Sequence, residues 1–290
     1  KNYGVYGFCY YHYWFNGKRL LNRPLDDMLR TKTPDFPFML CWANENWSRK
    51  WDGMDQEVLI KQNYSPEDDK RHIQFLLRSV FSDPRYIKVE GKPFFVIYRT
   101  PLIPDVRRTL DTWRIEARAA GFNGLYIGYM QSFGYTGRPE EDGFDCAVDF
   151  QPDFGNMALR VNESVLAKVF RKLKVRRSVA FDNVIFDYPD YVDHVVTTLK
   201  LQPGVYPGIS PMWDNTARRK GGATIFRNST PQVYKKWLQH IVDEYKAVPG
   251  DDKFVFINAW NEWAEGNHLE PCQKWGSQYL EVTKEVLGNA

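Results

Sequence analysis

The stretch Phe94-Phe95-Val96-Ile97-Tyr98 is an unbroken apolar run of strand length that directly follows Pro93. Strands of a parallel sheet are covered by helices on both faces and read as continuous apolar runs, whereas a strand with one wet face alternates apolar and polar residues. This run therefore favours a parallel sheet buried between helices.

Similar runs recur along the chain and are separated by amphipathic stretches of helical period. We expect strands at residues 4–11, 37–43, 93–98, 125–130, 144–150, 205–213 and 254–259. The alternation predicts an α/β fold of the (β/α)8 TIM-barrel-like type, in one catalytic domain over residues 1–290. Because the seven strands are one short of a barrel and the first begins at residue 4, we expect the first strand and helix unit to be missing.

Three helices have clear start signals. Ser65 precedes Pro66 and two acidic residues, Asp105 precedes a helical pattern that stops at Gly121, and a third pattern begins at Thr230 and Pro231. The segments 156–161 and 174–182 read as barrel insertions. The basic run 171–177 has the composition of a solvated helix face, and we assign it no function.

Composition excludes several classes of protein. The chain has 39 Lys and Arg against 36 Asp and Glu, and a net charge of +3 gives no large field to attract nucleic acid or an anionic membrane. No apolar run reaches the roughly 18 residues that a spanning helix needs, which predicts no membrane insertion. Cys9, Cys41, Cys146 and Cys272 lie far apart, so we expect buried free thiols in a reducing compartment.

Polar and aromatic residues crowd at three predicted strand ends. The segments are Cys9-Tyr10-Tyr11-His12-Tyr13-Trp14, Cys41-Trp42-Ala43-Asn44-Glu45-Asn46-Trp47 and Asn258-Ala259-Trp260-Asn261-Glu262-Trp263-Ala264-Glu265-Gly266. The working residues of an α/β barrel lie at the carboxyl ends of its strands. Amides and carboxylates can bond sugar hydroxyls, and Trp and Tyr rings can pack on the apolar face of a sugar. These segments therefore predict a carbohydrate substrate.

Glu262 and Glu265 are the candidate catalytic residues. Glycoside chemistry needs one carboxylic acid to protonate the leaving oxygen and a second carboxylate as nucleophile or base, about 5 to 5.5 Å apart in retaining enzymes. Residues three apart in a helical turn have Cβ atoms about 5–6 Å apart. Two acids that close push each other's pKa values apart, which separates an acid from a base.

Other residues of these segments, and of the strand ending near Trp213, are candidate substrate-binding residues. Glu45 can serve as a sugar ligand or as a second catalytic carboxylate, and His12 and His268 can bind sugar or a backbone carbonyl. No His, Asp or Glu group has the spacing of metal ligands, so we predict neither metal nor cofactor. The full set is Tyr11, His12, Trp14, Trp42, Asn44, Glu45, Asn46, Trp47, Trp213, Asp214, Trp260, Asn261 and His268.

The three quoted segments resemble the WbsX-like family over nearly the whole chain. Members of that family are described as glycosyltransferases of bacterial surface-polysaccharide clusters, which implies a bacterial cytoplasmic enzyme. The family is itself similar to glycoside hydrolase family 99, the endo-α-mannosidases, which carry a Glu-Trp-x-Glu-Gly motif. Residues 262–266 match that motif position by position.

This resemblance implies a division of labour between the two acids. Glu265 would be the general acid and base at the glycosidic oxygen, and Glu262 would draw the proton from the sugar 2-hydroxyl, which then attacks the anomeric carbon. The reaction would be retaining and pass through a 1,2-anhydro sugar. Family 99 usually has His where this chain has Ala264, so the resemblance does not imply mannose specificity.

Three functions remain open from the sequence. A retaining glycoside hydrolase is favoured by the two acids among aromatic residues. A glycosyltransferase of surface-polysaccharide biosynthesis is favoured by the family resemblance, although no DxD-like acidic pair for a sugar nucleotide is evident. A non-catalytic carbohydrate-binding barrel would keep the aromatic residues but has no need for both Glu262 and Glu265.

Overall fold

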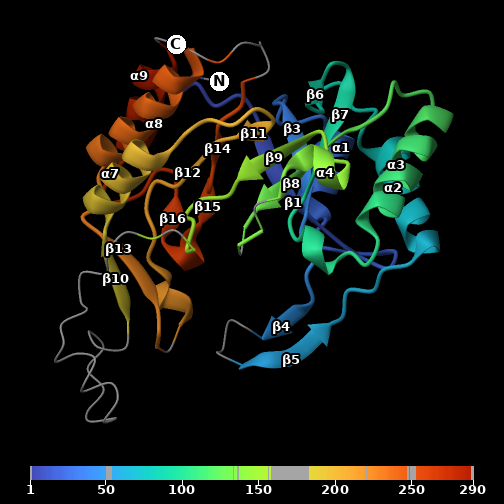
Figure 1. Cartoon of the computed structure of the whole chain (residues 1–290), viewed down its shortest axis with the longest axis horizontal. Helices are drawn as coiled ribbons and strands as arrows, with labels where there is room; N and C mark the ends of the chain where they lie inside the picture. The colour runs from blue at the N-terminus through green and yellow to red at the C-terminus, as the bar shows by residue number, and fades with distance from the viewer. Residues whose placement is uncertain are drawn as a thin grey trace.

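The computed structural model describes residues 2–49, 54–132, 134–135, 137–155, 157, 183–219, 221–246, 248 and 253–288. These residues form a mixed α/β fold with a mostly parallel central sheet (Figure 1). The predicted insertion at 174–182, most of the one at 156–161 and the basic run at 171–177 lie outside the described residues.

The central sheet carries six parallel strands in the described part of the chain. They are β1 (Phe8–Phe15), β3 (Phe38–Trp42), β7 (Lys92–Ile97), β8 (Tyr126–Gln131), β9 (Cys146–Asp149) and β11 (Val205–Tyr206). Their spatial order is β11-β9-β8-β7-β3-β1, and two short antiparallel strands, β2 (Lys18–Leu20) and β6 (Lys88–Val89), join β1 and β7. Residues 94–97 of β7 are fully buried, which confirms the predicted parallel sheet.

The predicted strand over 205–213 is instead split at Pro207. β11 pairs with β9, whereas β12 (Gly208–Ile209) pairs in parallel with β14 (Phe256–Ile257). Pro207 has no N–H to donate to a ladder, but its carbonyl oxygen accepts a hydrogen bond from Phe256 at 2.9 Å. The prediction of one continuous strand is therefore wrong, and the chain changes its partner from β9 to β14 at this proline.

β1 begins and ends four residues later than the predicted span of 4–11. Its register with β3 runs from Phe8 opposite Phe38 to His12 opposite Trp42, and β2 then pairs with residues 13–15. This second partner extends the strand through residues that the sequence alone placed in a loop.

The two ends of the strand series approach one another through aromatic contacts. The ring centroids of Tyr6 and Phe254 lie 6.0 Å apart, and those of Phe8 and Trp260 lie 5.3 Å apart. No ladder joins β14 to β1 among the residues that the structure describes. Barrel closure and a missing first unit therefore stay predictions.

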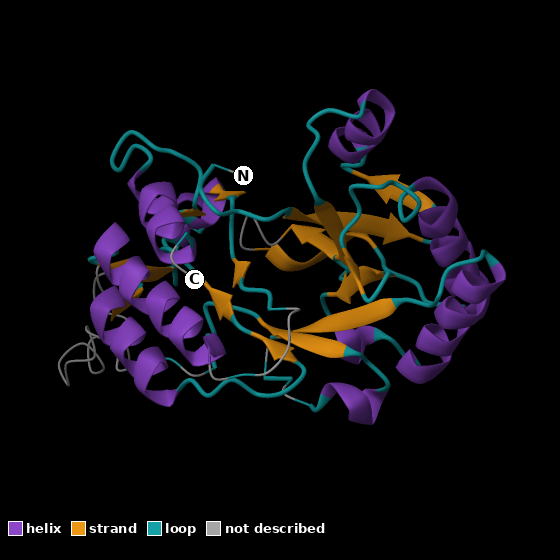
Figure 2. Cartoon of the chain, turned by 90° about the horizontal axis from the view of Figure 1, so that it is seen from above, coloured by secondary structure: helices purple, strands orange, loops and turns teal. Residues whose placement is uncertain are grey.

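Helices cover the sheet on two flanks. They are α1 (Arg23–Thr31), α2 (Pro66–Ser79), α3 (Val106–Ala119), α4 (Pro139–Asp142), α7 (Tyr188–Thr198), α8 (Pro231–Lys246) and α9 (Gln278–Leu287). Figures 1 and 2 show α7, α8 and α9 stacked on one flank, and α2 beside α3 on the other. None of the helices in the described segments is both long and apolar enough to cross a membrane.

The predicted helix starts are confirmed. The Ser65 hydroxyl accepts a hydrogen bond from the Asp68 N–H at 3.1 Å, and the Asp105 carboxylate accepts one from the Arg108 N–H at 3.1 Å. Each cap satisfies a donor that the first turn of a helix leaves without an intrahelical partner. The third predicted helix is α8, which begins at Pro231.

Short paired strands and 3-10 turns lie around the ends of the sheet. The pairs are β4 (Trp47–Arg49) with β5 (Met54–Ile60), β10 (Val184–Asp187) with β13 (Thr224–Arg227), and β15 (Asn261–Glu262) with β16 (Asn267–His268). The turns are η2 (Thr100–Leu102), η3 (Asn215–Arg218) and η4 (Trp263–Glu265). The sequence predicted none of the strands in these pairs and neither η2 nor η3, whereas η4 lies between the two acids for which a helical turn was considered.

All four cysteines are free, but only Cys41 and Cys146 are buried as predicted. Cys272 is half-buried and Cys9 is exposed to solvent, so the prediction is wrong for these two. No strand pairs with the outer edge of β1 at Cys9 in the described part of the sheet.

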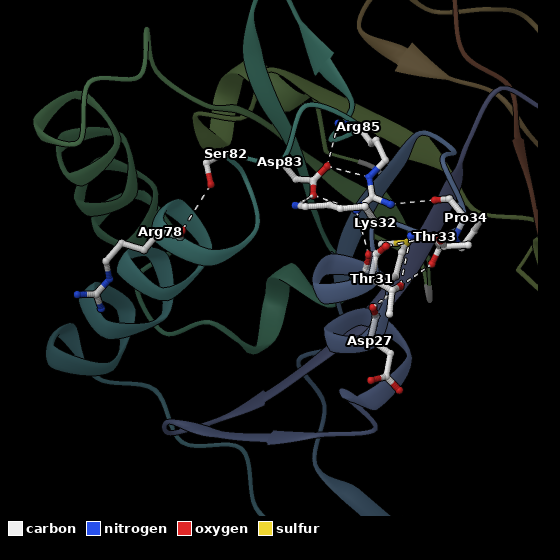
Figure 3. A network of polar contacts seen from close by, with 10 residues as sticks. Asp27, Thr31, Lys32, Thr33, Pro34, Arg78, Ser82, Asp83 and Arg85 are labelled. Carbon is white, nitrogen blue, oxygen red and sulfur yellow. Dashed lines mark hydrogen bonds and ion pairs between the residues drawn. The ribbon is translucent and has the colours of Figure 1, made fainter.

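A buried ion pair fixes the side of the sheet where β3 and β7 begin (Figure 3). The Asp83 carboxylate accepts hydrogen bonds from the Arg85 guanidinium at 2.9 Å and from Lys32 at 3.0 Å. Arg85 also donates to the backbone oxygens of Pro34 and Met28. The hydrogen bonds from Arg85 hold the pKa of Asp83 well below its usual range.

We expect Asp83→Asn to lower the free energy of unfolding by about 2–3 kcal/mol, because it leaves the buried Arg85 without its charged partner. Urea unfolding would measure the loss. Asp27→Asn is the matched control, since Asp27 pairs with Arg30 at the surface of the same region, and no measurable loss is expected there. An equal effect of both variants would contradict the assigned role of Asp83.

Candidate active site

The carboxyl ends of β1, β3 and β7 meet the segment that follows β14. Tyr11 on β1 and Tyr98 after β7 have ring centroids 5.8 Å apart, and Tyr13 stacks on Trp47 at 5.4 Å. Desolvation by burial raises the pKa of Tyr13, and the negative charge of Glu262 raises it further. The three predicted strand ends are therefore brought together.

The two candidate catalytic acids stand at either end of one tight turn. Glu262 ends β15 and precedes η4, in which Glu265 is the last residue. A 3-10 helix has three residues per turn, so Glu262, the residue before η4, and Glu265 stand one turn apart along the chain. Gly266 then ends the turn with φ at 55°, and its N–H donates to the Trp263 carbonyl oxygen at 3.0 Å. The turn between the two acids is therefore of the 3-10 type.

Glu265 lies in an environment suited to proton transfer near neutral pH. Desolvation by burial raises its pKa to about 7, the neighbouring charge of Glu262 acts in the same direction, and Arg218 and Arg219 oppose the rise. The Arg218 guanidinium donates to Glu265 Oε1 at 2.7 Å. About a fifth of each of the two paired side chains, Arg218 and Glu265, is exposed, so Glu265 remains accessible.

An ion pair and a buried amide hold the ends of β3 and β7 together. The Asn44 amide donates to the Arg99 carbonyl oxygen at 2.9 Å and to the Tyr64 hydroxyl at 3.1 Å, and its oxygen accepts from the Arg99 N–H at 2.8 Å. Asn44 is fully buried, whereas Glu45 is half-buried and paired with the Arg99 guanidinium. Burial raises the pKa of Tyr98 and the charges of Glu45 and Glu265 add to the rise, which locates all three in one cluster.

Three of the predicted binding residues, His12, Trp14 and Trp42, lie in the core instead of at the cluster. The His12 and His72 Nε2 atoms lie 3.0 Å apart, and Trp14 donates its indole N–H to Asp68 at 3.0 Å. Desolvation lowers the pKa of His12 to about 3, so this imidazole is neutral at physiological pH. Alternation along β1 explains the placement, because His12 and Trp14 point to the opposite face from Tyr11 and Tyr13.

The remaining predicted binding residues include both exposed and buried side chains. Asn46 and Asn261 are exposed, and Asn46 also accepts a hydrogen bond from the Gln62 N–H at 2.8 Å. Asp214 is exposed and caps η3 by accepting a hydrogen bond from the Thr216 N–H at 3.0 Å. The other three are more enclosed: Trp213 and His268 are buried, and Trp260 is half-buried against the core.

Four residues of the cluster are not among the predicted site residues: Tyr13, Tyr98, Arg99 and Arg218. Tyr98 is the last residue of a predicted strand and Arg99 follows it directly, so both lie at a carboxyl strand end, where barrel enzymes carry their working residues. Tyr13 belongs to the first of the three aromatic and polar segments. Arg218 carries no local signal, because its contact with Glu265 joins residues 47 positions apart.

The described residues contain no group of three or more His, Cys, Asp or Glu side chains placed to hold a metal ion. The cluster instead offers the carboxylates of Glu262 and Glu265, tyrosine hydroxyls and two arginines in ion pairs. Such a set can donate and accept protons and can bond the hydroxyls of a polar ligand.

The sequence model of the family described as Glycosyltransferase WbsX matches residues 1–283. The chain belongs to the WbsX glycosyltransferase family. This membership places it among carbohydrate-processing enzymes. A protein of Xanthomonas campestris pv. campestris named "Uncharacterized protein WxcX" is 36% identical over 291 residues in each of two strains, B100 and ATCC 33913. The alignment covers 100% of this chain and 40% of the relative, so the chain spans less than half of that protein's length.

Solved structures resemble this WbsX-family chain in fold. One is a "Glycoside hydrolase-like protein", with a TM-score of 0.56 and 15% identity over 99% of this chain and 82% of that one. Another is the GH99 endo-α-mannosidase from Bacteroides thetaiotaomicron, with a TM-score of 0.53 and 16% identity over 96% of this chain and 73% of that one. At this level of identity the likeness describes the fold alone, and it supports the TIM-barrel-like class.

Proposed function

We propose that the chain cleaves a glycosidic bond within a polysaccharide or oligosaccharide with retention of configuration, using Glu265 and Glu262. The observation that carries the proposal is the pKa of about 7 at Glu265, raised first by burial and further by the adjacent Glu262. A carboxylic acid with that pKa is protonated in a large share of molecules at neutral pH and can serve as a general acid.

In this proposal Glu265 gives its proton to the glycosidic oxygen as the bond to the anomeric carbon breaks. Glu262 takes the proton of the sugar 2-hydroxyl, and that oxygen forms the new bond to the anomeric carbon. Water then attacks the same carbon as its bond to the 2-oxygen breaks, Glu265 accepts a proton from the water, and Glu262 returns its proton to the 2-oxygen. The resemblance of residues 262–266 to the family 99 motif supports these roles.

The sugar next to the reacting bond would contact the accessible members of the cluster. We place Tyr11, Tyr13 and Tyr98 beside the reacting unit, with the Glu45 and Arg99 pair available for hydroxyls. Asn46, Trp47, Asp214 and Asn261 would contact more distant parts of the glycan. His12, Trp14, Trp42, Asn44, Trp213 and Trp260 would support these residues from the packed side instead of binding sugar themselves.

Transfer to a sugar hydroxyl, in the synthesis of a bacterial surface polysaccharide, is the second candidate function. The description of the matching family as a glycosyltransferase favours it. The same two acids would serve, with an acceptor hydroxyl taking the place of water in the second step. The two functions differ in the acceptor that the site admits and, where a sugar nucleotide supplies the glycosyl group, in the donor as well.

Product analysis on the surface polysaccharide of the source organism would separate them. The protein is incubated with the polysaccharide, with and without sugar nucleotides, and products are sized by mass spectrometry. Shortened oligosaccharides without any nucleotide are the expected result. Extension of the glycan only when a sugar nucleotide is present would make transfer the function and reject hydrolysis.

The pH dependence of turnover tests the role of Arg218. Activity that needs protonated Glu265 declines as pH rises through the pKa of about 7. Arg218 lowers that pKa, so in Arg218→Gln the pKa of Glu265 is expected to rise and the alkaline limb of kcat/KM to move to higher pH. Arg218→Lys keeps the charge and is expected to leave the limb near its original position. A downward shift in Arg218→Gln would contradict the assignment.

A further inference from the structure

Trp263 presents one face of its indole to solvent directly beside the two acids. It lies in η4 between Glu262 and Glu265, and 46% of its surface is exposed, whereas most tryptophans of the described chain are buried. Exposing a large aromatic side chain forgoes the stabilisation that burial brings. An exposed indole at this position therefore calls for an explanation other than core packing.

The indole is nevertheless held in place on two sides. Its opposite face stacks on the His268 ring, with centroids 3.8 Å apart and planes 15° from parallel. Its N–H donates to Glu270 Oε2 at 2.8 Å. His268 is itself buried on β16, and its Nδ1 lies 3.1 Å from the Glu270 carbonyl oxygen. A ring fixed at its edge and at one face loses little entropy when a ligand covers the other face.

The geometry of η4 gives the direction of this free face. Trp263 and Glu265 stand two positions apart in η4, where successive side chains point about 120° apart, so the indole projects to a different side from Glu265. It flanks the place where a bond would break and does not occupy it. A ligand on this face would therefore be a neighbour of the reacting unit.

We propose that Trp263 is a stacking platform for a neutral pyranose unit next to the one whose bond reacts. The inference rests on the proposed function, because it is the glycan bound at Glu262 and Glu265 that would reach the indole. A pyranose whose hydroxyls are mostly equatorial has an apolar C–H face that packs on an aromatic ring. The carboxylate of Glu270, bonded at the ring edge, disfavours an anionic sugar at this position.

This assignment changes the part played by His268. The sequence left open whether its imidazole binds sugar or a backbone carbonyl. In the structure the imidazole lies beneath the indole and beside a carbonyl oxygen, so it supports the platform from behind. The residue that meets the glycan would be Trp263.

Kinetics on glycan fragments of graded length test the platform. Fragments are prepared from the surface polysaccharide of the source organism by partial acid hydrolysis, and kcat and KM are measured for the full-length protein. Trp263→Ala is expected to raise KM about tenfold, equivalent to about 1.4 kcal/mol, for fragments long enough to reach the platform. The shortest reactive fragment should show no change, and Trp263→Phe should retain most of the affinity. Tyr6→Ala removes another exposed aromatic residue, on the side where β1 begins, and is the matched control.

The possible outcomes distinguish a role of Trp263 in binding the glycan from a role in turnover. A loss of kcat that is equal at every fragment length would mean that Trp263 only holds η4 in shape, and unchanged KM at every length would also overturn the proposal. If the parent protein neither hydrolyses nor transfers, titration of the same fragments by tryptophan fluorescence decides. Binding that depends on Trp263 then keeps the platform and rejects the proposed function, whereas absent or unaffected binding rejects the platform.

Discussion

Glu265→Gln is expected to lower kcat by about 10³-fold, the middle of the range for loss of a general acid and base. Gln has nearly the same shape as Glu but cannot give a proton to the glycosidic oxygen or take one from water. Its amide can still bond the Arg218 side chain that now pairs with the carboxylate. KM should therefore change little, and steady-state kinetics of the parent and the variant would measure both effects.

The controls for this variant lie nearby in the chain. Glu270→Gln alters another carboxylate of the same region, bonded to Trp263, and should retain turnover within about tenfold, as expected for loss of a single hydrogen bond. The melting temperature of each variant shows whether the fold survives. If Glu265→Gln keeps most of its turnover while Glu262→Gln loses it, the roles proposed for the two acids are wrong.

The fold could be predicted from sequence wherever burial alone decides the pattern. Continuous apolar runs such as residues 94–97 are buried on both faces, and that property is visible in the residues themselves. The strand predictions were wrong where the pairing of strands, and not burial, determines where a strand ends. Pro207 moves the chain from one partner strand to another, and β2 extends β1 through Tyr13 to Phe15. No local pattern shows which strand will lie alongside.

The residues of the candidate site also fall into two groups: those that a local sequence pattern indicates and those that depend on how distant segments pack. Glu262 and Glu265 could be chosen because they share one short segment with a tight turn and a glycine. Arg218 could not, because its ion pair with Glu265 depends on how η3 packs against η4. His12 and Trp14 lie in the same segment as Tyr11 and Tyr13 but face the core, since strand alternation places them on the other side. A motif gives residue types at a strand end, and the phase of the strand decides which of them reach the ligand.

Gly266→Ala is expected to lower kcat strongly, although by less than Glu265→Gln. Its φ of 55° lies in the left-handed region, and a Cβ added there would lie 2.7 Å from the Asp214 carbonyl oxygen and 3.0 Å from the Asp214 Cβ. The backbone at Asp214 cannot rotate away, because its N–H donates to the Glu265 carbonyl oxygen at 2.8 Å. Gly266→Ala must therefore separate η3 from η4, and with them Arg218 from Glu265. A displacement near 1 Å lowers kcat by about 10²-fold.

The Gly276→Ala variant distinguishes the effect of the steric clash at Gly266 from the effect of backbone strain. Gly276 has φ at 53°, but no atom outside its neighbours lies within 4 Å of an added Cβ. Both variants carry the left-handed penalty of about 1 kcal/mol, so both should lose comparable stability in urea unfolding, with a further loss in Gly266→Ala. Only Gly266→Ala should lose turnover. Full activity in Gly266→Ala would mean that the close contact between η3 and η4 does not set the position of Glu265.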